Sequence, residues 1–314
     1  MTSECGNVSG LHAEPNEDLL ITAVAQQGLW ASSNAGSSWY ALGTGAGSAS
    51  VTNRIVQVLD DPDHPHTWWE AGIYNGGGVY KTTDSGTTLK QVGNIGHTDS
   101  VSVDFKDAQR KTMLAGGHEQ PRRLYKSTDS GNNWSDIGAS LPDQTFCTFP
   151  LIIDSQTYLV GCGGYLSGPK GVYRSTDGGS SWKQASSSGG NGAPLRASDG
   201  SIYWLSSDSS GLARSLDDGA HWSVAGGANM NFNGGVEELP DGRIATLSGS
   251  TVVVSANHGV DWRAVTPQFP LPLNGFTYSK ARKAFFGFRF TCANGSIPVP
   301  TRAINRFDFD YTKP

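Results

Sequence analysis

Two short segments contain side chains suited to acid–base chemistry. One is His97-Thr-Asp99 and the other is Gly117-His118-Glu119. Imidazole titrates near neutral pH, so a histidine can take or give a proton, and a neighbouring carboxylate can orient it. We predict that His97 and His118 are catalytic and that Glu119 orients His118 or binds substrate. The alternatives for these positions are a solvated or capping histidine and a rim carboxylate.

Other side chains are suited to binding an anionic, hydroxyl-rich ligand. Arginine can hold a carboxylate through two parallel hydrogen bonds, and tyrosine can donate a proton or stack on a sugar ring. We predict a catalytic role for Tyr165. We predict substrate binding by Arg54, Arg122, Arg196, Arg289, Tyr74, Asn75 and Asn233. Each arginine could instead form an ion pair between elements, and each tyrosine could be an ordinary strand residue.

The elements that must position these residues are indicated by a repeated motif. It has the form Ser/Thr-x-Asp/Asn-x-Gly-x-x-Trp, with Leu in place of Trp once. Its acidic or amide position falls at Asn34, Asp84, Asp129, Asp177, Asp217 and Asn257. Asp and Asn cap such turns through backbone N–H groups, and Gly takes the φ > 0 position. Each motif, called a box below, therefore predicts a hairpin turn between two strands.

The spacing of the boxes predicts the fold. Two further strand-like runs precede each hairpin, and four strands in about 45 residues are typical of one β-propeller blade. The 314 residues thus correspond to about seven blades. We predict an all-β, seven-bladed β-propeller forming a single domain over residues 1–314, whose seventh blade has no box and is completed by contact between the chain ends.

This topology also predicts where a site would lie. The loop from one blade's outermost strand to the next blade's innermost strand shares a face with the loop between the second and third strands. The boxes lie on the opposite face. The first face receives the His, Arg, Tyr and Asn residues named above, whereas the box face receives Ser, Thr and Gly turns. We therefore expect one asymmetric central site on the face opposite the boxes.

The boxes resemble the Asp-box, or BNR repeat, of sialidases and related secreted propellers, in which the box is a structural turn. The stretch from His97 to Arg123 also resembles secreted propeller lyases that cleave the rhamnose–glucuronate linkage of plant arabinogalactan. In those enzymes a His-Thr-Asp turn and a Gly-Gly-His-Glu loop flank the same blade. The resemblance implies a structural Ca²⁺ in some members, but no Asp-x-Asp-x-Asp loop here supports one. We expect no required cofactor and no catalytic metal.

Three functions are compatible with these residues. The first is a polysaccharide lyase that cleaves a uronic-acid glycan by β-elimination, which needs a base, a proton donor and a carboxylate neutraliser. The second is a sialidase-like glycoside hydrolase, although Asn53-Arg54-Ile55-Val56 lacks the proline of the sialidase motif. The third is a non-catalytic glycan-binding propeller. We favour the lyase, because Arg or Asn, His and Tyr on the predicted face can fill its three roles. Loops that differ from blade to blade favour one central site over the repeated sites of a lectin propeller.

The composition and the cysteines limit the possible partners and the cellular compartment. The net charge is −5 with no basic cluster, which disfavours nucleic acid and anionic membranes. We expect a monomer that acts on an anionic plant or microbial polysaccharide. Cys147 and Cys162 fall on consecutive strands, and Cys5 and Cys292 fall in the first and seventh blades, so we predict two disulfides. Disulfides indicate export, and the N-terminus shows no leader pattern, as expected for a secreted chain whose leader has been removed.

Overall fold

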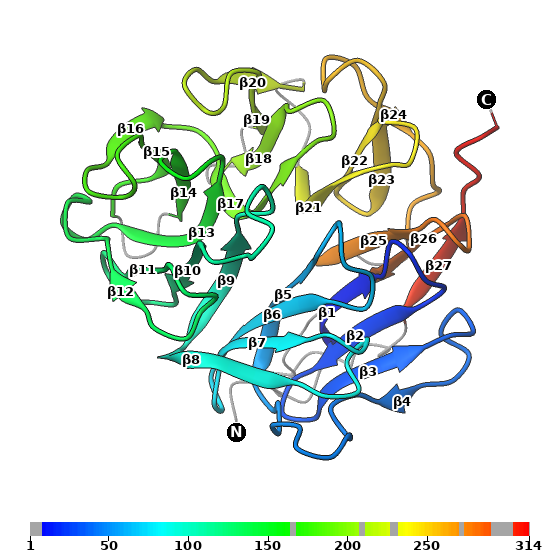
Figure 1. Cartoon of the computed structure of the whole chain (residues 1–314). Coiled ribbons are helices and arrows are strands. Elements are labelled where there is room, and N and C mark those ends of the chain that lie inside the picture. The colour runs from blue at the N-terminus through cyan, green and yellow to red at the C-terminus, as the bar shows by residue number, and fades with distance from the viewer. Residues whose placement is uncertain are drawn as a thin grey trace, which may run out of the picture.

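The seven-bladed prediction is confirmed. The computed structural model describes residues 8–163, 168–206, 211–226, 232–269, 273–289 and 304–313. These residues form 27 strands and no helix, and the strands make seven antiparallel sheets arranged in a ring (Figure 1). The first strand of each sheet lies nearest the centre of the ring, and the last lies toward the rim.

The sheets take their strands in chain order, and we number the blades from the N-terminus. Blade 1 contains β1 (Val8–Ala13), β2 (Leu20–Val24), β3 (Gly28–Ser32) and β4 (Tyr40–Ala41). Blade 2 contains β5 (Arg54–Asp60), β6 (Trp68–Ile73), β7 (Gly78–Thr82) and β8 (Lys90–Gly96). Blade 3 contains β9 (Thr98–Val103), β10 (Met113–Gly117), β11 (Leu124–Ser127) and β12 (Ser135–Asp136). Blade 4 contains β13 (Phe146–Ile152), β14 (Tyr158–Gly163), β15 (Gly171–Ser175) and β16 (Lys183–Ser186).

The remaining blades follow the same order. Blade 5 contains β17 (Gly190–Arg196), β18 (Ile202–Ser206), β19 (Leu212–Ser215) and β20 (Ser223–Ala225). Blade 6 contains β21 (Phe232–Glu238), β22 (Ile244–Ser248), β23 (Thr251–Ser255) and β24 (Arg263–Ala264). Blade 7 contains β25 (Gly275–Ser279), β26 (Ala284–Phe288) and β27 (Asn305–Asp308). The described residues thus give blade 7 three strands, and residues 1–7, which the prediction would use to complete it, lie outside them.

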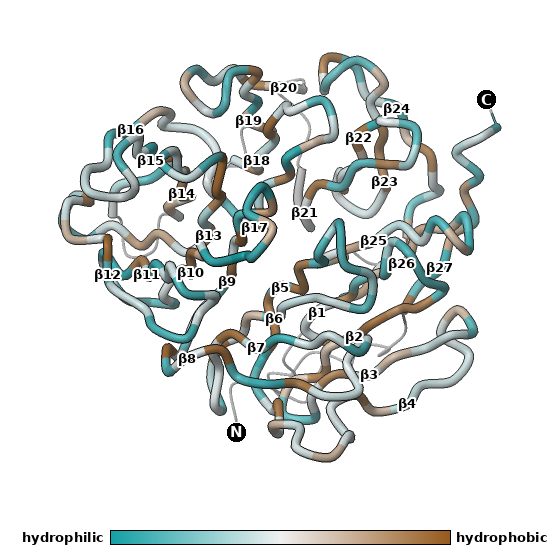
Figure 2. The backbone as a smooth tube through the Cα atoms, viewed as in Figure 1, coloured by the Kyte–Doolittle hydropathy of each residue, from teal (hydrophilic) through white to brown (hydrophobic). Residues whose placement is uncertain are grey.

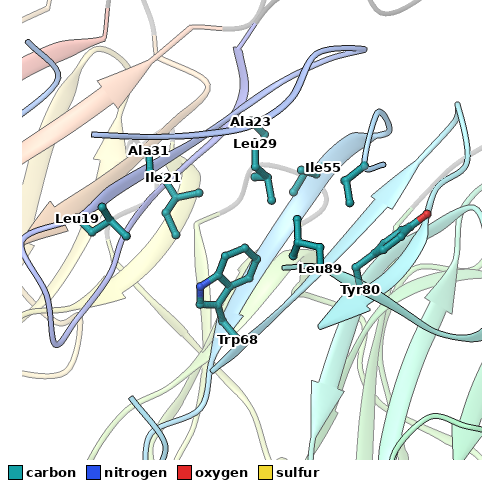
Figure 3. Packing of buried hydrophobic residues seen from close by; sticks show 10 residues of the cluster. Leu19, Ile21, Ala23, Leu29, Ala31, Ile55, Trp68, Tyr80 and Leu89 are labelled. Atoms are coloured by element: carbon teal, nitrogen blue, oxygen red, sulfur yellow. The ribbon is translucent and has the colours of Figure 1, made fainter. Parts of the chain in front are cut away.

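The core is divided into clusters that each join two neighbouring blades. Strands in the middle of the blades are buried along their whole length, as in β6 and β10, because both faces of the sheet are covered. In Figure 3, Leu19 and Ile21 of blade 1 pack around Trp68 and Leu89 of blade 2. Seven such clusters serve the seven contacts around the ring. Figure 2 shows hydrophobic residues on many strands and hydrophilic residues in many peripheral turns.

The contact between blades 1 and 7 closes the ring. Ala13 and Leu20 pack against Ala284 and Phe286. The backbone N–H of Ala13 donates to Thr277 Oγ1 at 3.1 Å. These contacts hold blades 1 and 7 side by side.

The six boxes form the hairpins that the motif predicts. In each box the first Ser or Thr accepts the N–H of the box glycine through its hydroxyl at 2.8–2.9 Å. Each Asp or Asn accepts the N–H four residues later at 2.8–2.9 Å. The box glycines all have positive φ, from 76° to 93°. Two tryptophans bridge blades, because Trp134 donates to the carbonyl of Val92 and Trp182 to that of Ile137.

The predicted Cys147–Cys162 disulfide is present and joins β13 to β14 within blade 4. The predicted Cys5–Cys292 pair lies outside the described residues. In the part of the chain that the structure describes, no helix has the length and hydrophobicity of a membrane span.

Candidate active site

The two predicted histidines meet at the face opposite the boxes. His97 lies between β8 and β9, and His118 follows β10 directly. The backbone N–H of His118 donates to the carbonyl of His97 at 2.8 Å, and the ring centroids are 4.9 Å apart. A register shift at Gly116/Gly117 accompanies the end of β10. Such irregularities re-aim side chains at the end of a strand.

His118 is the centre of a hydrogen-bonded chain. Its Nδ1 lies 3.0 Å from both carboxylate oxygens of Asp99, which is buried within β9. Its Nε2 lies 3.1 Å from the hydroxyl of Tyr74, which comes from the turn after β6 in blade 2. Because a carboxylate can only accept, it assigns the imidazole proton to Nδ1 and leaves the Nε2 lone pair to accept from the Tyr74 O–H.

His97 completes the cluster from the other side of Tyr74. Its Nδ1 accepts the backbone N–H of Tyr74 at 3.4 Å, so Nε2 is the protonated nitrogen of the neutral ring. Burial, together with the charge of His118, lowers the pKa of His97 below its usual 6.5, although Glu119 and Asp99 act in the opposite direction. His97 is therefore a neutral imidazole at pH 7.

The backbone is strained where these side chains meet. Tyr74, His97 and Glu119 have φ values of 57°, 59° and 53°, and Asn75 and Arg122 have 41° and 54°. A left-handed conformation costs a non-glycine residue about 1 kcal/mol or more. Strain of this kind collects at functional sites, where the surrounding structure imposes it. Ten other non-glycine residues within the described chain share this conformation, five of them in the boxes, so the site is identified by the contacts of its side chains and not by backbone strain.

The structure changes the expected partner of His118. Glu119, the residue predicted to orient it, is 43% exposed and lies 3.6 Å from Nε2, on the side away from Asp99. Asp99 orients the ring instead. The pairing of β9 with β10 places Asp99 opposite the register shift at Gly116/Gly117, directly before His118. Tyr74, predicted only to bind substrate, contacts the catalytic candidate directly.

The predicted binding residues are distributed over different parts of the molecule. Arg54 begins β5 and pairs with Ile73, one residue before Tyr74, and Asn75 is exposed beside Tyr74. Arg122 lies in the loop of His118 and pairs with Asp143 at 2.9 Å. Arg289 follows β26 on the same face in blade 7.

Arg196 is not brought into the cluster. Arg196 ends β17 at the box face, where it contacts the carbonyl of Ile153 and the carboxylate of Asp218 at 3.1 Å. The strand β17 has seven residues and runs from the site face to the box face. Arg196 is its last residue, so it lies at the box face although the loop before β17 lies at the site face. Tyr165 lies outside the described residues, and for Asn233, within β21, no side-chain position is described.

A cation could also be held in the cluster. Ligand atoms of His97, His118 and Glu119 lie within 4.8 Å of one another. Two imidazoles with one carboxylate suit zinc-like ions better than Ca²⁺, which prefers oxygen ligands. The hydrogen bond from Tyr74 already uses the Nε2 lone pair of His118, so a metal would have to displace the tyrosine. We therefore describe the cluster as an acid–base site.

Comparisons with known proteins support the fold. No family model and no curated protein matches the chain, so neither resemblance seen in the motifs is confirmed by them. The GH74 xyloglucanase from Xanthomonas campestris is similar with a TM-score of 0.63 at 16% identity, over 98% of this chain and 55% of that one. An extracellular domain assigned to a one-component system of B. thetaiotaomicron has a TM-score of 0.63 at 12% identity, over 91% of this chain and 38% of that one. A streptogramin B lyase has a TM-score of 0.62 at 10% identity, over 91% and 92%.

These comparisons define the class of the molecule. It is a seven-bladed β-propeller. The chain spans about half the length of the xyloglucanase that it resembles. Identities of this size establish shape and not activity.

Proposed function

We propose that the protein is an extracellular carbohydrate-active enzyme, a lyase that cleaves uronic-acid glycans of the rhamnose–glucuronate type. The observation that carries the proposal is the Asp99–His118–Tyr74 hydrogen-bonded chain with neutral His97 beside it. A base and a proton donor are what β-elimination requires. The disulfide in blade 4 supports the extracellular assignment, since such bonds persist in oxidising compartments.

In the proposed reaction each group has a role. His118 Nε2 takes the Tyr74 hydroxyl proton while the Tyr74 oxygen takes the proton from C5 of the uronate. The C5–H electron pair forms the C4=C5 double bond, and the C4–O4 bond breaks. His97 Nε2–H donates a hydrogen bond to the departing O4, and O4 takes its proton from solvent, because a neutral imidazole does not give up its remaining proton near neutral pH. Asp99 stabilises the imidazolium of His118 in the same way that buried carboxylates support catalytic histidines.

The substrate carboxylate must be neutralised for the C5 proton to become acidic. Arg54 is the first candidate, because it pairs in the sheet with Ile73, the residue directly before Tyr74. Arg289 is a second candidate on the same face. An arginine can hold a carboxylate bidentately. The partner is therefore an anionic polysaccharide, which a monomer could bind, and the scheme requires no cofactor.

A hydrolase centred on Asp99 and Glu119 is the alternative that the sequence left open. Glycoside hydrolysis by two carboxylates needs both to face the scissile bond. Both oxygens of Asp99 lie at hydrogen-bond distance from His118, and the side chain is 11% exposed. This arrangement favours an orienting role for Asp99 and hence the lyase.

Incubation with gum arabic and with pectin fragments tests the proposal. A lyase produces an unsaturated uronate, which is followed by its ultraviolet absorbance, and dialysis against EDTA should leave the rate unchanged. His118→Ala and His97→Ala should each lower the rate on the order of 10²–10⁴-fold. His221→Ala, in an exposed box turn, is the matched control and should keep the full rate. Release of reducing sugar without absorbance would establish a hydrolase, and full activity in both histidine variants would remove the site assignment.

A further inference from the structure

A second group of polar side chains surrounds a cavity at the other end of the central channel. The cavity has a volume of about 740 Å³ and is lined by residues of blades 1, 2, 5, 6 and 7. Its rim includes turns between first and second strands, at Asn16, Ser198, Pro240 and Lys280. These turns share a face with the boxes. The cavity, called the box-face cavity below, therefore lies opposite the histidine cluster.

Five acidic or basic residues of the described chain line this cavity: His12, Asp60, Glu237, Glu238 and Lys280. His12 of β1 and Asp60 of β5 face each other, with Nε2 and Oδ2 2.8 Å apart but without the alignment of a good hydrogen bond. Glu237 of β21 accepts the backbone N–H of Tyr278 at 2.7 Å. The Oδ1 atom of Asp60 is buried and has no hydrogen-bond partner within the described residues. A buried acceptor without a partner is costly and needs a donor from water or a ligand.

The charges of these groups nearly balance. Burial by itself lowers the pKa of His12, but the attraction of Asp60 and Glu237 outweighs it and the pKa is raised. Burial raises the pKa of Glu237 to about 7, although the Tyr278 hydrogen bond opposes the shift. The raised pKa favours the imidazolium form of His12 beside Asp60, and the raised pKa of Glu237 favours its neutral form.

The rest of the lining is largely apolar. Pro194 and Leu195 of blade 5 and Val236 of blade 6 form one side of the cavity. A volume of about 740 Å³ lies within the range of roughly 300–1,000 Å³ that is usual for small-molecule sites, and such sites combine apolar walls with a few converging polar groups.

We propose that the box-face cavity binds a neutral, hydroxyl-bearing sugar unit. Hydroxyl groups donate to the accessible part of the Asp60 carboxylate, whose side chain is 17% exposed, and the apolar side receives the C–H face of a sugar ring. The carboxylates of Asp60 and Glu238 disfavour an anion. The imidazolium of His12 and the ammonium of Lys280 disfavour a free cation. This inference is independent of the chemistry proposed for the opposite face.

Binding of single sugars to the full chain tests the proposal. D-galactose and L-arabinose are titrated by calorimetry and by ligand-observed NMR, with D-glucuronate as the anionic probe and CaCl₂ as the cationic probe. We expect the neutral sugars to bind and D-glucuronate to bind more weakly. Asp60→Asn should lower the neutral-sugar affinity by about tenfold or more, because a charged hydrogen-bond acceptor is lost.

Two further variants make the outcome decisive. Glu237→Gln keeps the shape of the cavity wall and should also lower the affinity, while His118→Ala at the opposite face should leave it unchanged. Melting temperatures confirm that each variant is folded. Three outcomes would each overturn the proposal. The neutral sugars do not bind, or they bind but His118→Ala abolishes the binding. The third is that Ca²⁺ binds in place of the sugars and Asp60→Asn removes that binding.

Discussion

At the scale of single residues, the site depends on which group fixes the histidine ring. Asp99 accepts from His118 Nδ1 inside a buried strand, and this fixes the tautomer that leaves Nε2 free for Tyr74. A histidine next to a glutamate in sequence suggested a different partner. The difference arises because Glu119, in a tight turn with φ of 53°, extends away from Asp99.

Asp99→Asn tests this positioning role. The amide keeps the size of the carboxylate but can donate as well as accept, so it can stabilise the other tautomer of His118. We expect kcat on the uronate substrate to fall by about 10²-fold or more with little change in KM. The acidic limb of the pH–rate profile should move as well. A purely structural role would instead lower the melting temperature and leave the pH profile of the remaining activity unchanged.

At the scale of elements, the boxes and the site differed in how far they could be predicted. Each box is a local turn, and its Ser, Asp and Gly bond within five residues, so the motif was sufficient to predict it. The contact between Tyr74 and His118 joins two blades across 44 residues. Nothing local in the sequence indicates such a pair. Arg196 was misplaced for the related reason that a strand carries its last residue to the opposite face.

Ser175→Ala tests the box as a structural unit. The Ser175 hydroxyl is buried, donates to Asp177 and accepts the N–H of Gly179. Its loss leaves a buried donor unsatisfied, so the free energy of unfolding should fall by about 1–2 kcal/mol. Urea denaturation measures this, with exposed Ser155→Ala as the control. Enzyme activity at urea concentrations below the unfolding transition should be unchanged, because the turn lies on the face opposite the site.

The disulfide in blade 4 gives a second element-scale prediction. It closes a segment of 15 residues between β13 and β14. Closing a loop of this length stabilises a protein by about 3 kcal/mol through the entropy of the unfolded chain. The double variant Cys147→Ser with Cys162→Ser should unfold at correspondingly lower urea concentration. An unchanged midpoint would show that the packing of blade 4 alone is sufficient.

At the scale of the whole molecule, buried carboxyl groups make stability depend on pH. Glu70 is completely buried in β6 and its Oε1 accepts from Asn53 at 3.2 Å. Burial raises its pKa to about 8 from an ordinary 4.5. The folded protein therefore holds this proton more tightly than the unfolded chain does. As the pH rises, the free energy of unfolding therefore begins to fall near the pKa of Glu70 in the unfolded chain. It continues to fall until the pH exceeds the pKa of Glu70 in the folded protein.

Glu70→Gln removes this titration. We expect the melting temperature of the wild type to fall between about pH 5 and pH 9, and that of the variant to fall less. The two proteins should be similar at the acidic end and the variant more stable at the basic end. A smaller decline remains because Glu237 also has a raised pKa. Exposed Asp143→Asn serves as the control. Parallel curves for wild type and variant would show that Glu70 does not titrate in this range.

The left-handed backbone at Tyr74, His97 and Glu119 has a consequence for evolution in the laboratory. Glycine accepts this conformation without a steric penalty, so replacing any of the three by glycine relieves local strain. A population selected for heat resistance alone, with no demand for turnover, should therefore accumulate glycine at these positions early. The ring would survive such selection, whereas the acid–base cluster would be lost first. Five non-glycine box residues share this conformation, so glycine gained in the boxes should leave activity intact, whereas glycine at Tyr74 or His97 should remove it.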